Sequence, residues 1–531
     1  MKNLRRWALK NKALILFSLF LIFLYFRGIG DHGLIDPVEG VNASVALHML
    51  GGGNYFVPRI GEALTSGSSM GTWWLTALSL KIFGWGEFAA RFFSALSGLG
   101  MILVSALCAK IHEDDSKRKS WLAACICAGM TLNFAVSQLA SSQALYACLT
   151  SFAMFGIIRS YDNKRWLIFS HLMIAFAFII HGPSGLFMPF IAVSAYCVLC
   201  EDWELLTDFF TYPAGILTNI IISGAYLSML VIFNPYIIHF MRCQSHVYTF
   251  GGALGMLIFI FMSFAPFHGF LIQAICEILP KKYPAEKSSE LFMLVYALFF
   301  AFAAIVSGDI LIMAASVPAL SAISGRRLDL WLNTKNLSGV RVPVILNILI
   351  LIPVLYILIP FTINHFPVIR GSLMSLIPYG ITSGLFLFAC WYYTKTRQLK
   401  KWIRNVLAAA LLCLMPLAGV FNLTAEIYSV RDIGLKLRDL VKGSDIVIQY
   451  GVNYPSVYFY SLRNSKIINA KLTPGTQEKN FAAKKTIITE LWNKNERIFL
   501  IVPEKMRISG VLPKNIFHIT ESDGTLLLSN K

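Results

Sequence analysis

Long apolar runs restrict this sequence more than any other feature. Each run has roughly the 20 residues that an α-helix needs to cross the hydrocarbon core of a bilayer. The runs recur from near the N-terminus to about residue 421, with short polar segments between them. A hydrophobic fraction of 56% and a mean hydropathy of +0.64 exclude an ordinary soluble domain. We predict an α-helical polytopic membrane protein.

The apolar runs predict about thirteen transmembrane helices. They are expected at residues 13–29, 89–110, 120–137, 142–158, 166–180, 185–200, 214–233, 251–275, 291–306, 309–323, 342–362, 377–393 and 404–421. No small-residue cleavage site follows the first run, so we expect it to be retained as a signal anchor.

The basic residues indicate the orientation. A formal charge of +18 would also suit a nucleic-acid-binding protein, but here the basic residues gather at the N-terminus and in alternate loops, such as 117–119 and 281–287. Lys and Arg concentrate in this way in cytoplasmic loops. We therefore predict a cytoplasmic N-terminus, a bacterial-type plasma (inner) membrane location, and no nucleic-acid partner.

The tail after residue 421 changes character and predicts a small extracytoplasmic α/β domain over 422–531. Residues 444–450 and 497–503 are apolar runs bounded by polar residues, which indicates buried strands. Residues 479–492 suit a helix between them, and the tyrosine-rich run 454–463 suits strand and turn packing. The remaining chain, 1–421, forms the transmembrane domain, with a large first extracytoplasmic loop at 31–88.

That first loop has two amphipathic stretches. The first begins at Asp36-Pro37, with apolar residues at helical spacing, and ends at the glycines 51–53. Asp36, Pro37 and Glu39 together are close to a capping box, a purely structural device. The second stretch begins near Gly71. Two surface helices joined in this way would roof a cavity on the extracytoplasmic side.

The order of residues in the loop resembles the ArnT-like and protein-mannosyltransferase-like group of GT-C glycosyltransferases. The matching segments are DPVEG at 36–40, ALHML at 46–50, NYFVPR at 54–59, GTWWLTALSLKIFG at 71–84 and EFAARFFSAL at 87–96. The resemblance implies a GT-C-like transmembrane fold. It also implies sugar transfer from a polyprenyl-phosphate carrier to an envelope acceptor, namely lipid A, a glycolipid, a glycan or a protein.

The resemblance places the candidate catalytic residues at the start of the loop. Glu39 matches an acidic position of the family, whereas Val38 stands where an Asp is common. Asp36 lies two residues away and could substitute for that Asp. A carboxylate there would act as the base on an acceptor hydroxyl or stabilise an oxocarbenium-like sugar. The catalytic and capping interpretations of these two residues stay open.

The candidate donor-phosphate and substrate-binding residues lie in several extracytoplasmic loops. They are Arg59, Trp73, Gln143, His181, Arg242 and His246. Arg suits a phosphate because its planar fork donates two bonds at once. Trp73 suits either a lipid anchor or a platform for a sugar ring. Gln143 stands where relatives often have Asp, so Gln143→Asp is expected to be tolerated or to improve turnover.

The departures from the family pattern leave two classes of function open. One is a membrane glycosyltransferase that transfers a hexose or a pentose. The other is a degenerate GT-C-like protein that binds or helps to assemble lipid-linked glycans without turnover. No required cofactor is expected, and His239, Cys243 and His246 match no zinc spacing. The sequence leaves a role for a divalent metal open.

Overall fold

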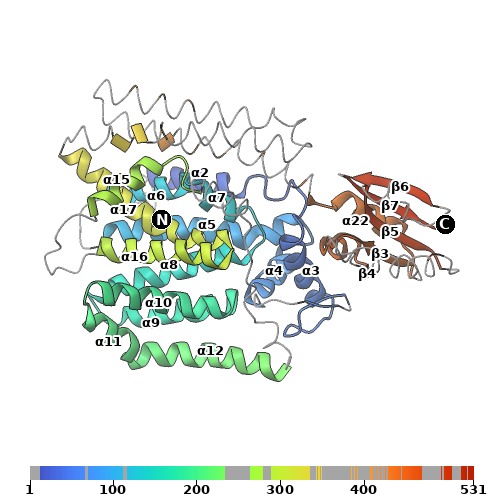
Figure 1. Ribbon diagram of the computed structural model, residues 1–531, viewed down its shortest axis with the longest axis horizontal. Helices are drawn as coiled ribbons and strands as arrows, with labels where there is room; N and C mark the ends of the chain where they lie inside the picture. Colours follow the sequence, from blue (N-terminus) through green and yellow to red (C-terminus); the bar gives the residue numbers. More distant parts are fainter. Residues whose placement is uncertain are drawn as a thin grey trace, which may run out of the picture. The chain divides into compact units, whose positions relative to one another are not determined.

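The computed structural model describes residues 12–233, 263–278, 289–334 and 429–531, except 62, 66–69, 112–116, 444, 469–491, 493–495, 505–515 and 523, and scattered positions between 342 and 428 (Figure 1). The chain divides into two compact units. The helical unit comprises Met1–Ile29, Gly67–Thr72 and Arg91–Val420, and the mixed unit comprises Gly30–Ser66, Trp73–Ala90 and Phe421–Lys531. The first loop, which the sequence assigned to the transmembrane domain, therefore belongs to the same compact unit as the tail.

The helical unit consists of apolar helices joined by short connections. Its described helices are α2 (Lys12–Phe26), α5 (Glu87–Lys110), α6 (Lys117–Gly129), α7 (Thr131–Ser137), α8 (Ser142–Ser160), α9 (Trp166–His181), α10 (Pro183–Leu199), α11 (Trp203–Thr211), α12 (Pro213–Phe233), α15 (His268–Ile278), α16 (Ser289–Ser307), η1 (Ile310–Ser316) and α17 (Val317–Asn333). Ten of the predicted spans overlap these elements, and the last three fall on residues of which only scattered positions are described.

By length and composition, α5, α12 and α16 can each cross a membrane, within the described residues. The pair α6 and α7, bent by 62°, passes the same test as one broken span. The shorter helices α2, α9, α10 and α15 are also apolar. The chain is thus a multi-pass membrane protein, and the number thirteen stays a prediction.

Close backbone approach joins α9 to α10. A Cβ built at Gly185 would lie 2.1 Å from the carbonyl oxygen of Ala177, so only glycine fits at this point. Small residues at such contacts let helices in a membrane pack tightly. The helices α8, α9, α10 and α12 accordingly lie side by side (Figure 1).

The predicted span 309–323 is not one α-helix. Asp309 precedes the 3₁₀ segment η1, where its Oδ1 accepts a hydrogen bond from the Leu311 N–H at 3.2 Å. The α-helix α17 begins only at Val317 and continues to Asn333. Pro318 lies in the first turn of α17, where its fixed φ suits a helix start and its missing N–H costs nothing.

The mixed unit contains a five-stranded sheet in the order β4-β3-β5-β7-β6. Its strands are β3 (Ile446–Tyr450), β4 (Ser465–Ile468), β5 (Ile498–Pro503), β6 (Phe517–Ser522) and β7 (Thr525–Ser529). β3 is parallel to β4 and β5, whereas β7 is antiparallel to β5 and β6. The structure therefore confirms the strands predicted at 444–450 and 497–503, while most of the helix predicted at 479–492 lies outside the described residues.

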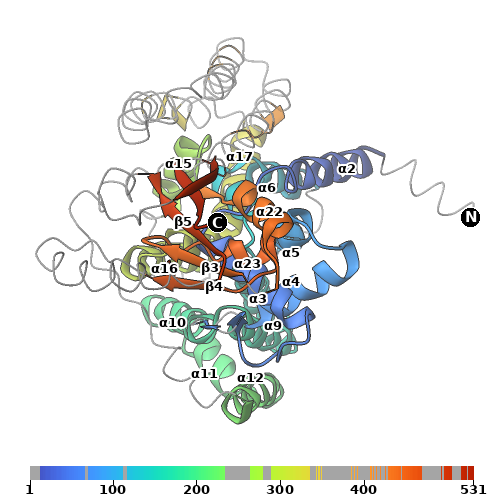
Figure 2. The ribbon, with the colours of Figure 1, turned by 90° about the vertical axis from the view of Figure 1, so that its right-hand side faces the viewer.

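Both faces of this sheet are buried. Along β5, Phe499 and Ile501 pack with α22 (Arg431–Leu440), and Ile498 and Leu500 pack with the opposite cluster, which includes Trp492. Figure 2 shows α22 and α23 (Ser456–Ser461) beside β3. Burial on both faces explains why the strand reads as a continuous apolar run rather than an alternating one.

The first loop contributes two helices and a short hairpin to the mixed unit. The helices are α3 (Val38–Leu50) and α4 (Met70–Phe83), and the hairpin pairs β1 (Arg59–Ile60) with β2 (Ala63–Leu64). Both predicted helices are therefore present, but α3 is mostly buried rather than a surface helix. In the tail, the tyrosine-rich run forms the helix α23 rather than the predicted strand and turn.

Candidate functional site

Asp36 joins the first loop to the tail. Its Oδ1 accepts a hydrogen bond from the Ser456 N–H at 3.1 Å, and its Oδ2 accepts one from the Ser456 hydroxyl. Ser456 is the first residue of α23, so the carboxylate lies at the N-terminus of that helix. N–H groups there have no partner within the helix and attract an anion.

Glu39 lies within the same mixed unit, one turn further along. Its Oε2 accepts a hydrogen bond from the Ile35 N–H at 2.8 Å, and the side chain is only 1% exposed. The predicted capping box is therefore absent. Glu39 accepts from the Ile35 N–H, which lies before the N-cap residue Pro37, and Asp36 accepts from Ser456 of α23 rather than from α3.

Burial raises the pKa of Asp36 to about 7. The two hydrogen bonds from Ser456 act in the opposite direction, and the nearby charge of Glu39 raises the pKa further. Because its pKa lies near 7, Asp36 can take up or release a proton near neutral pH, which is the behaviour a general acid or base requires.

We expect the raised pKa of Asp36 to make the mixed unit less stable as pH rises from about 4 to about 7. In that window the unfolded carboxyl is ionised while the folded one is protonated, so the unfolded state binds fewer protons and the free energy of unfolding falls. The loss is at most about 4 kcal/mol. Asp36→Asn should remove it, since an amide still accepts from the Ser456 N–H.

Thermal unfolding of the full chain in detergent at pH 5 and pH 8 measures this effect. The difference between wild type and Asp36→Asn isolates the contribution of this one carboxyl. An equal pH dependence in both proteins would contradict the assignment.

Further contacts hold α23 against the first loop. The Leu34 N–H donates to the Tyr460 hydroxyl at 2.7 Å, and Tyr460 in turn donates to Glu87 Oε1 at 3.2 Å. Arg431 pairs with the same Glu87 oxygen at 3.1 Å. Tyr460 therefore has structural partners within the unit, and no local sequence pattern predicts them.

Trp73 and Arg59 differ in accessibility. Trp73 is 1% exposed, and its Nε1 donates to Asn42 Oδ1 at 2.7 Å. The indole is enclosed and hydrogen-bonded, so packing accounts for Trp73 in this structure, and a role with lipid or sugar stays a prediction. Arg59 is exposed on β1. Burial lowers the pKa of His48, and the charge of Arg59 lowers it further. Arg59 remains available for an anion.

The helical unit carries a second polar cluster at the ends of α8, α9 and α16. His181 Nδ1 lies 2.7 Å from the Ser184 hydroxyl, and its ring packs on Tyr146 with centroids 4.5 Å apart. Gln143 Nε2 donates to Asp309 Oδ2 at 2.8 Å. Asp309 also lies within electrostatic reach of His181. The structure thus brings together two of the predicted residues, Gln143 and His181.

Asp309 belongs to this cluster although it was not among the predicted binding residues. Its signal was the Ser-Gly-Asp turn at 307–309 before an apolar run, which is an N-cap pattern as well as a source of negative charge. The Oε1 atom of Gln143 is buried and makes no hydrogen bond in the described part of the chain. It can accept a hydrogen bond from a bound hydroxyl. Arg242 and His246, like His239 and Cys243, lie outside the described residues.

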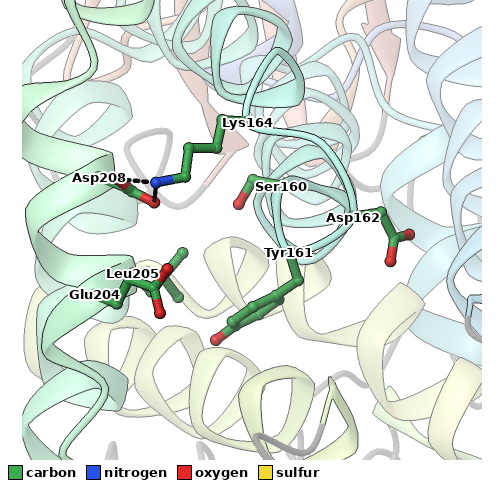
Figure 3. Close-up of a pocket in the computed structure, with 7 residues that line it drawn as sticks. All are labelled: Ser160, Tyr161, Asp162, Lys164, Glu204, Leu205 and Asp208. Carbon is green, nitrogen blue, oxygen red and sulfur yellow. Dashed lines mark hydrogen bonds and ion pairs between the residues drawn. The ribbon is translucent and has the colours of Figure 1, made fainter.

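A separate polar cavity of about 270 Å³ lies at the opposite ends of α8 and α9 (Figure 3). There Lys164 reaches across from the α8–α9 connection and pairs with Asp208 of α11 at 2.7 Å. The Tyr161 hydroxyl donates to Asp202 Oδ2 at 2.5 Å. The predicted orientation makes this the cytoplasmic end, away from Gln143 and His181.

Comparison with known proteins shows similarities in both sequence and fold. A family profile described as dolichyl-phosphate-mannose-protein mannosyltransferase matches residues 68–239. The crystal structure of apo ArnT from Cupriavidus metallidurans superposes with a TM-score of 0.77, covering 98% of each chain at 16% identity. The undecaprenyl phosphate-α-4-amino-4-deoxy-L-arabinose arabinosyl transferase of Aeromonas hydrophila is 23% identical to this chain over 255 residues. In fold and in part of its sequence, the chain is similar to ArnT-like GT-C glycosyltransferases.

Other ArnT-like relatives agree. The undecaprenyl phosphate-α-4-amino-4-deoxy-L-arabinose arabinosyl transferase 2 of Pseudomonas fluorescens is 31% identical to this chain over 146 residues. The match covers 27% of this chain and 24% of that protein. The Aeromonas match covers 47% of this chain and 44% of its relative. This ArnT-like chain therefore aligns with less than half the length of these curated relatives, although the fold corresponds over nearly its whole length.

Proposed function

We propose that this protein transfers a sugar from a polyprenyl-phosphate carrier to an acceptor of the cell envelope on the extracytoplasmic face. The observation that carries the proposal is the ArnT fold over 98% of the chain. The same ArnT has also been crystallised with undecaprenyl phosphate bound, with a TM-score of 0.73 to this chain. Several curated relatives are named as transferases that use an undecaprenyl-phosphate-linked aminoarabinose.

In the proposed reaction, an acceptor hydroxyl attacks the anomeric carbon of the donor sugar. The new glycosidic bond forms as the bond to the carrier phosphate breaks, and the polyprenyl phosphate leaves as an anion. Because this leaving group is already stable, the protein has to position both substrates and take the hydroxyl proton. We assign Glu39 as the base that takes the proton of the acceptor hydroxyl. Asp36 is the second carboxyl group near it.

The remaining candidates are assigned to substrate binding. Within the mixed unit, the exposed Arg59 is assigned to the donor phosphate. Within the helical unit, His181 is assigned to substrate binding, as are Arg242 and His246, which lie outside the described residues. Gln143 Oε1 offers an acceptor to a sugar hydroxyl. The proposed step requires no cofactor, and a role for a divalent metal stays open.

The second candidate function is a non-enzymatic one, in which the protein binds lipid-linked glycans without turnover. It is favoured by the engagement of both carboxylates in structural bonds, with Glu39 only 1% exposed. Turnover with an isotopically labelled polyprenyl-phosphate sugar separates the two functions, since binding alone leaves the label on the carrier.

Comparison of envelope glycolipids by mass spectrometry, with and without the gene, tests the function and identifies the acceptor. Loss of one pentose or one hexose from a single lipid is the expected result. An unchanged glycolipid profile, together with no turnover of any labelled donor, would overturn the transferase proposal.

The contact with Asp309 reverses the expectation for Gln143→Asp. A carboxylate at position 143 would face the Asp309 carboxylate where a hydrogen bond now exists, and like charges at this distance repel. We expect Gln143→Asp to weaken donor binding about tenfold, and Gln143→Asp/Asp309→Asn to restore most of it. The KM for the donor in the two variants measures this. Full activity of the single variant would show that the contact is not needed.

A further inference from the structure

Three elements of the mixed unit each bring one polar side chain to its surface. The helix α3 packs against both α23 and β1, and Figure 2 shows α3 beside α23. The side chains are His48 in the last turn of α3, Tyr458 in α23 and Arg59 in β1. Arg59 is exposed and the other two are half-buried. All three are therefore accessible from outside the unit.

Tyr458 holds one side of the His48 ring. His48 Nδ1 lies 3.2 Å from the Tyr458 hydroxyl, and the two rings meet edge to face with centroids 6.0 Å apart. The other ring nitrogen, Nε2, makes no hydrogen bond among the described residues and is not enclosed. One nitrogen is thus engaged by the tail, and the other is available to a ligand.

Gly53 keeps the Nε2 edge of this ring open. Its N–H donates to the His48 carbonyl oxygen at 3.1 Å, which holds the loop close to the ring. A Cβ at Gly53 would lie 2.7 Å from His48 Cδ2 and 2.9 Å from Nε2. Any larger residue would therefore displace the imidazole or cover its free nitrogen.

The charge of Arg59 acts on the same ring. Burial is the larger cause of the lowered pKa of His48, and the Arg59 charge lowers it further. The ring is therefore uncharged near neutral pH and carries one proton. When the Tyr458 hydroxyl donates to Nδ1, this proton is on Nε2 and can be donated to a ligand.

The two available groups, the Arg59 guanidinium and the His48 N–H, are both donors. In the part of the chain that the structure describes, no carboxylate pairs with Arg59. A ligand that satisfies both donors must be an anion with several oxygen atoms. Phosphate fits best, because two of its oxygens match the planar fork of an arginine and either can also accept from an imidazole.

We propose that Arg59 and His48 together bind a phosphate group, and that Tyr458 of the tail is the positioning residue that holds His48 in its donating tautomer. The assignment rests on the proposed function, because it names the residues that hold a phosphate in that reaction. The phosphate belongs to the polyprenyl carrier or to a phosphorylated envelope acceptor. The recognition chemistry is the same for both.

The full-length protein in dodecyl maltoside micelles tests the proposal, because this detergent carries no charge. Undecaprenyl phosphate and undecaprenol form one pair of probes, and monophosphoryl lipid A and its dephosphorylated form are the other. Native mass spectrometry measures how much of each probe the protein retains. Wild type should prefer the phosphate-bearing member of one pair about a hundredfold, as expected for two contacts to a charged group. The pair that shows the preference identifies the source of the phosphate.

Two ring variants separate binding from positioning. His48→Phe keeps a ring of similar size without the N–H, so the preference should fall about tenfold. Tyr458→Phe removes only the hydroxyl and should lower it about threefold, with retention of the phosphate-free probe unchanged. In the double variant, Tyr458→Phe should add nothing to His48→Phe, since the hydroxyl acts through the imidazole. Additive losses, or weaker retention of both probes, would show that Tyr458 has only a structural role.

A pair of glycine variants remains informative if His48→Phe fails to fold. Gly53→Ala displaces the imidazole and should lower the preference about as much as His48→Phe. Gly51→Ala is the control, because the nearest atoms to a Cβ there lie at 3.6 Å, an ordinary contact distance. It should behave like wild type.

Equal retention within both pairs by wild type would overturn the proposal, as would an unchanged preference in His48→Phe or Gly53→Ala. Turnover of labelled donor is measured on the same preparations. A preference that depends on His48, found without turnover, would keep this site and remove the proposed transferase. Turnover without such a preference would do the reverse.

Discussion

Glu39→Gln is expected to lower sugar transfer at least about a hundredfold while the protein still folds and inserts. A general base contributes factors of this order to turnover, and an amide cannot accept the proton of the acceptor hydroxyl. Gln retains the oxygen that accepts from the Ile35 N–H, so the start of α3 should persist. The cost in stability is expected to be about 1 kcal/mol or less.

Turnover with labelled donor and thermal unfolding of the same preparation separate the two effects. Asp36→Asn is the matched control, since it also replaces a buried carboxyl by an amide in the same unit, and its loss of turnover should be smaller. Full activity of Glu39→Gln would move the base to Asp36. Full activity of both variants and of the double variant would exclude a carboxylate base.

Gly40→Ala is expected to destabilise the mixed unit by about 3 kcal/mol. A Cβ at this position would lie 1.9 Å from Asp36 Oδ1 and 2.7 Å from the Ser456 backbone N. The added methyl group must therefore displace the carboxylate from the N-terminus of α23. Two buried hydrogen bonds are lost as a result, which outweighs the better helix propensity of alanine.

Gly86→Ala provides the control for this prediction, because nothing lies within 4 Å of a Cβ there. Its stability should stay within about 0.5 kcal/mol of wild type. Thermal unfolding measures the difference, and protection of the α23 amides from hydrogen exchange locates it. Equal stability of the two variants would show that Asp36 and Ser456 contribute little to the joining of loop and tail.

The local pattern of apolar and polar residues was sufficient to predict many of the helices and two of the strands. Hydrophobic runs of membrane length predicted the helices, and short apolar runs between polar residues predicted β3 and β5. These predictions succeed because each depends on the residues of one segment and on the solvent around it. The resemblance of the first loop led to the ArnT-like family for the same reason, since its motifs lie close together in sequence.

The site depended on contacts between distant segments. The local sequence predicts that Asp36 caps the helix that follows it. Instead, Asp36 accepts a hydrogen bond from the first residue of a helix that begins 420 residues later. Trp73 reads as an interfacial aromatic, yet Asn42 and the packing around it enclose the indole. Gln143 reads as a substitution for Asp, whereas Asp309 already supplies the carboxylate it contacts.

By itself, then, the sequence determined the membrane-spanning class, two strands of the tail and the resemblance to ArnT-like proteins. Only the tertiary structure decided that the first loop and the tail form one unit, and which carboxylates and imidazoles have partners. The physical reason is that periodicity records how one segment meets water or lipid. A hydrogen bond between two segments requires both ends to be placed, and no pattern within either segment contains that information.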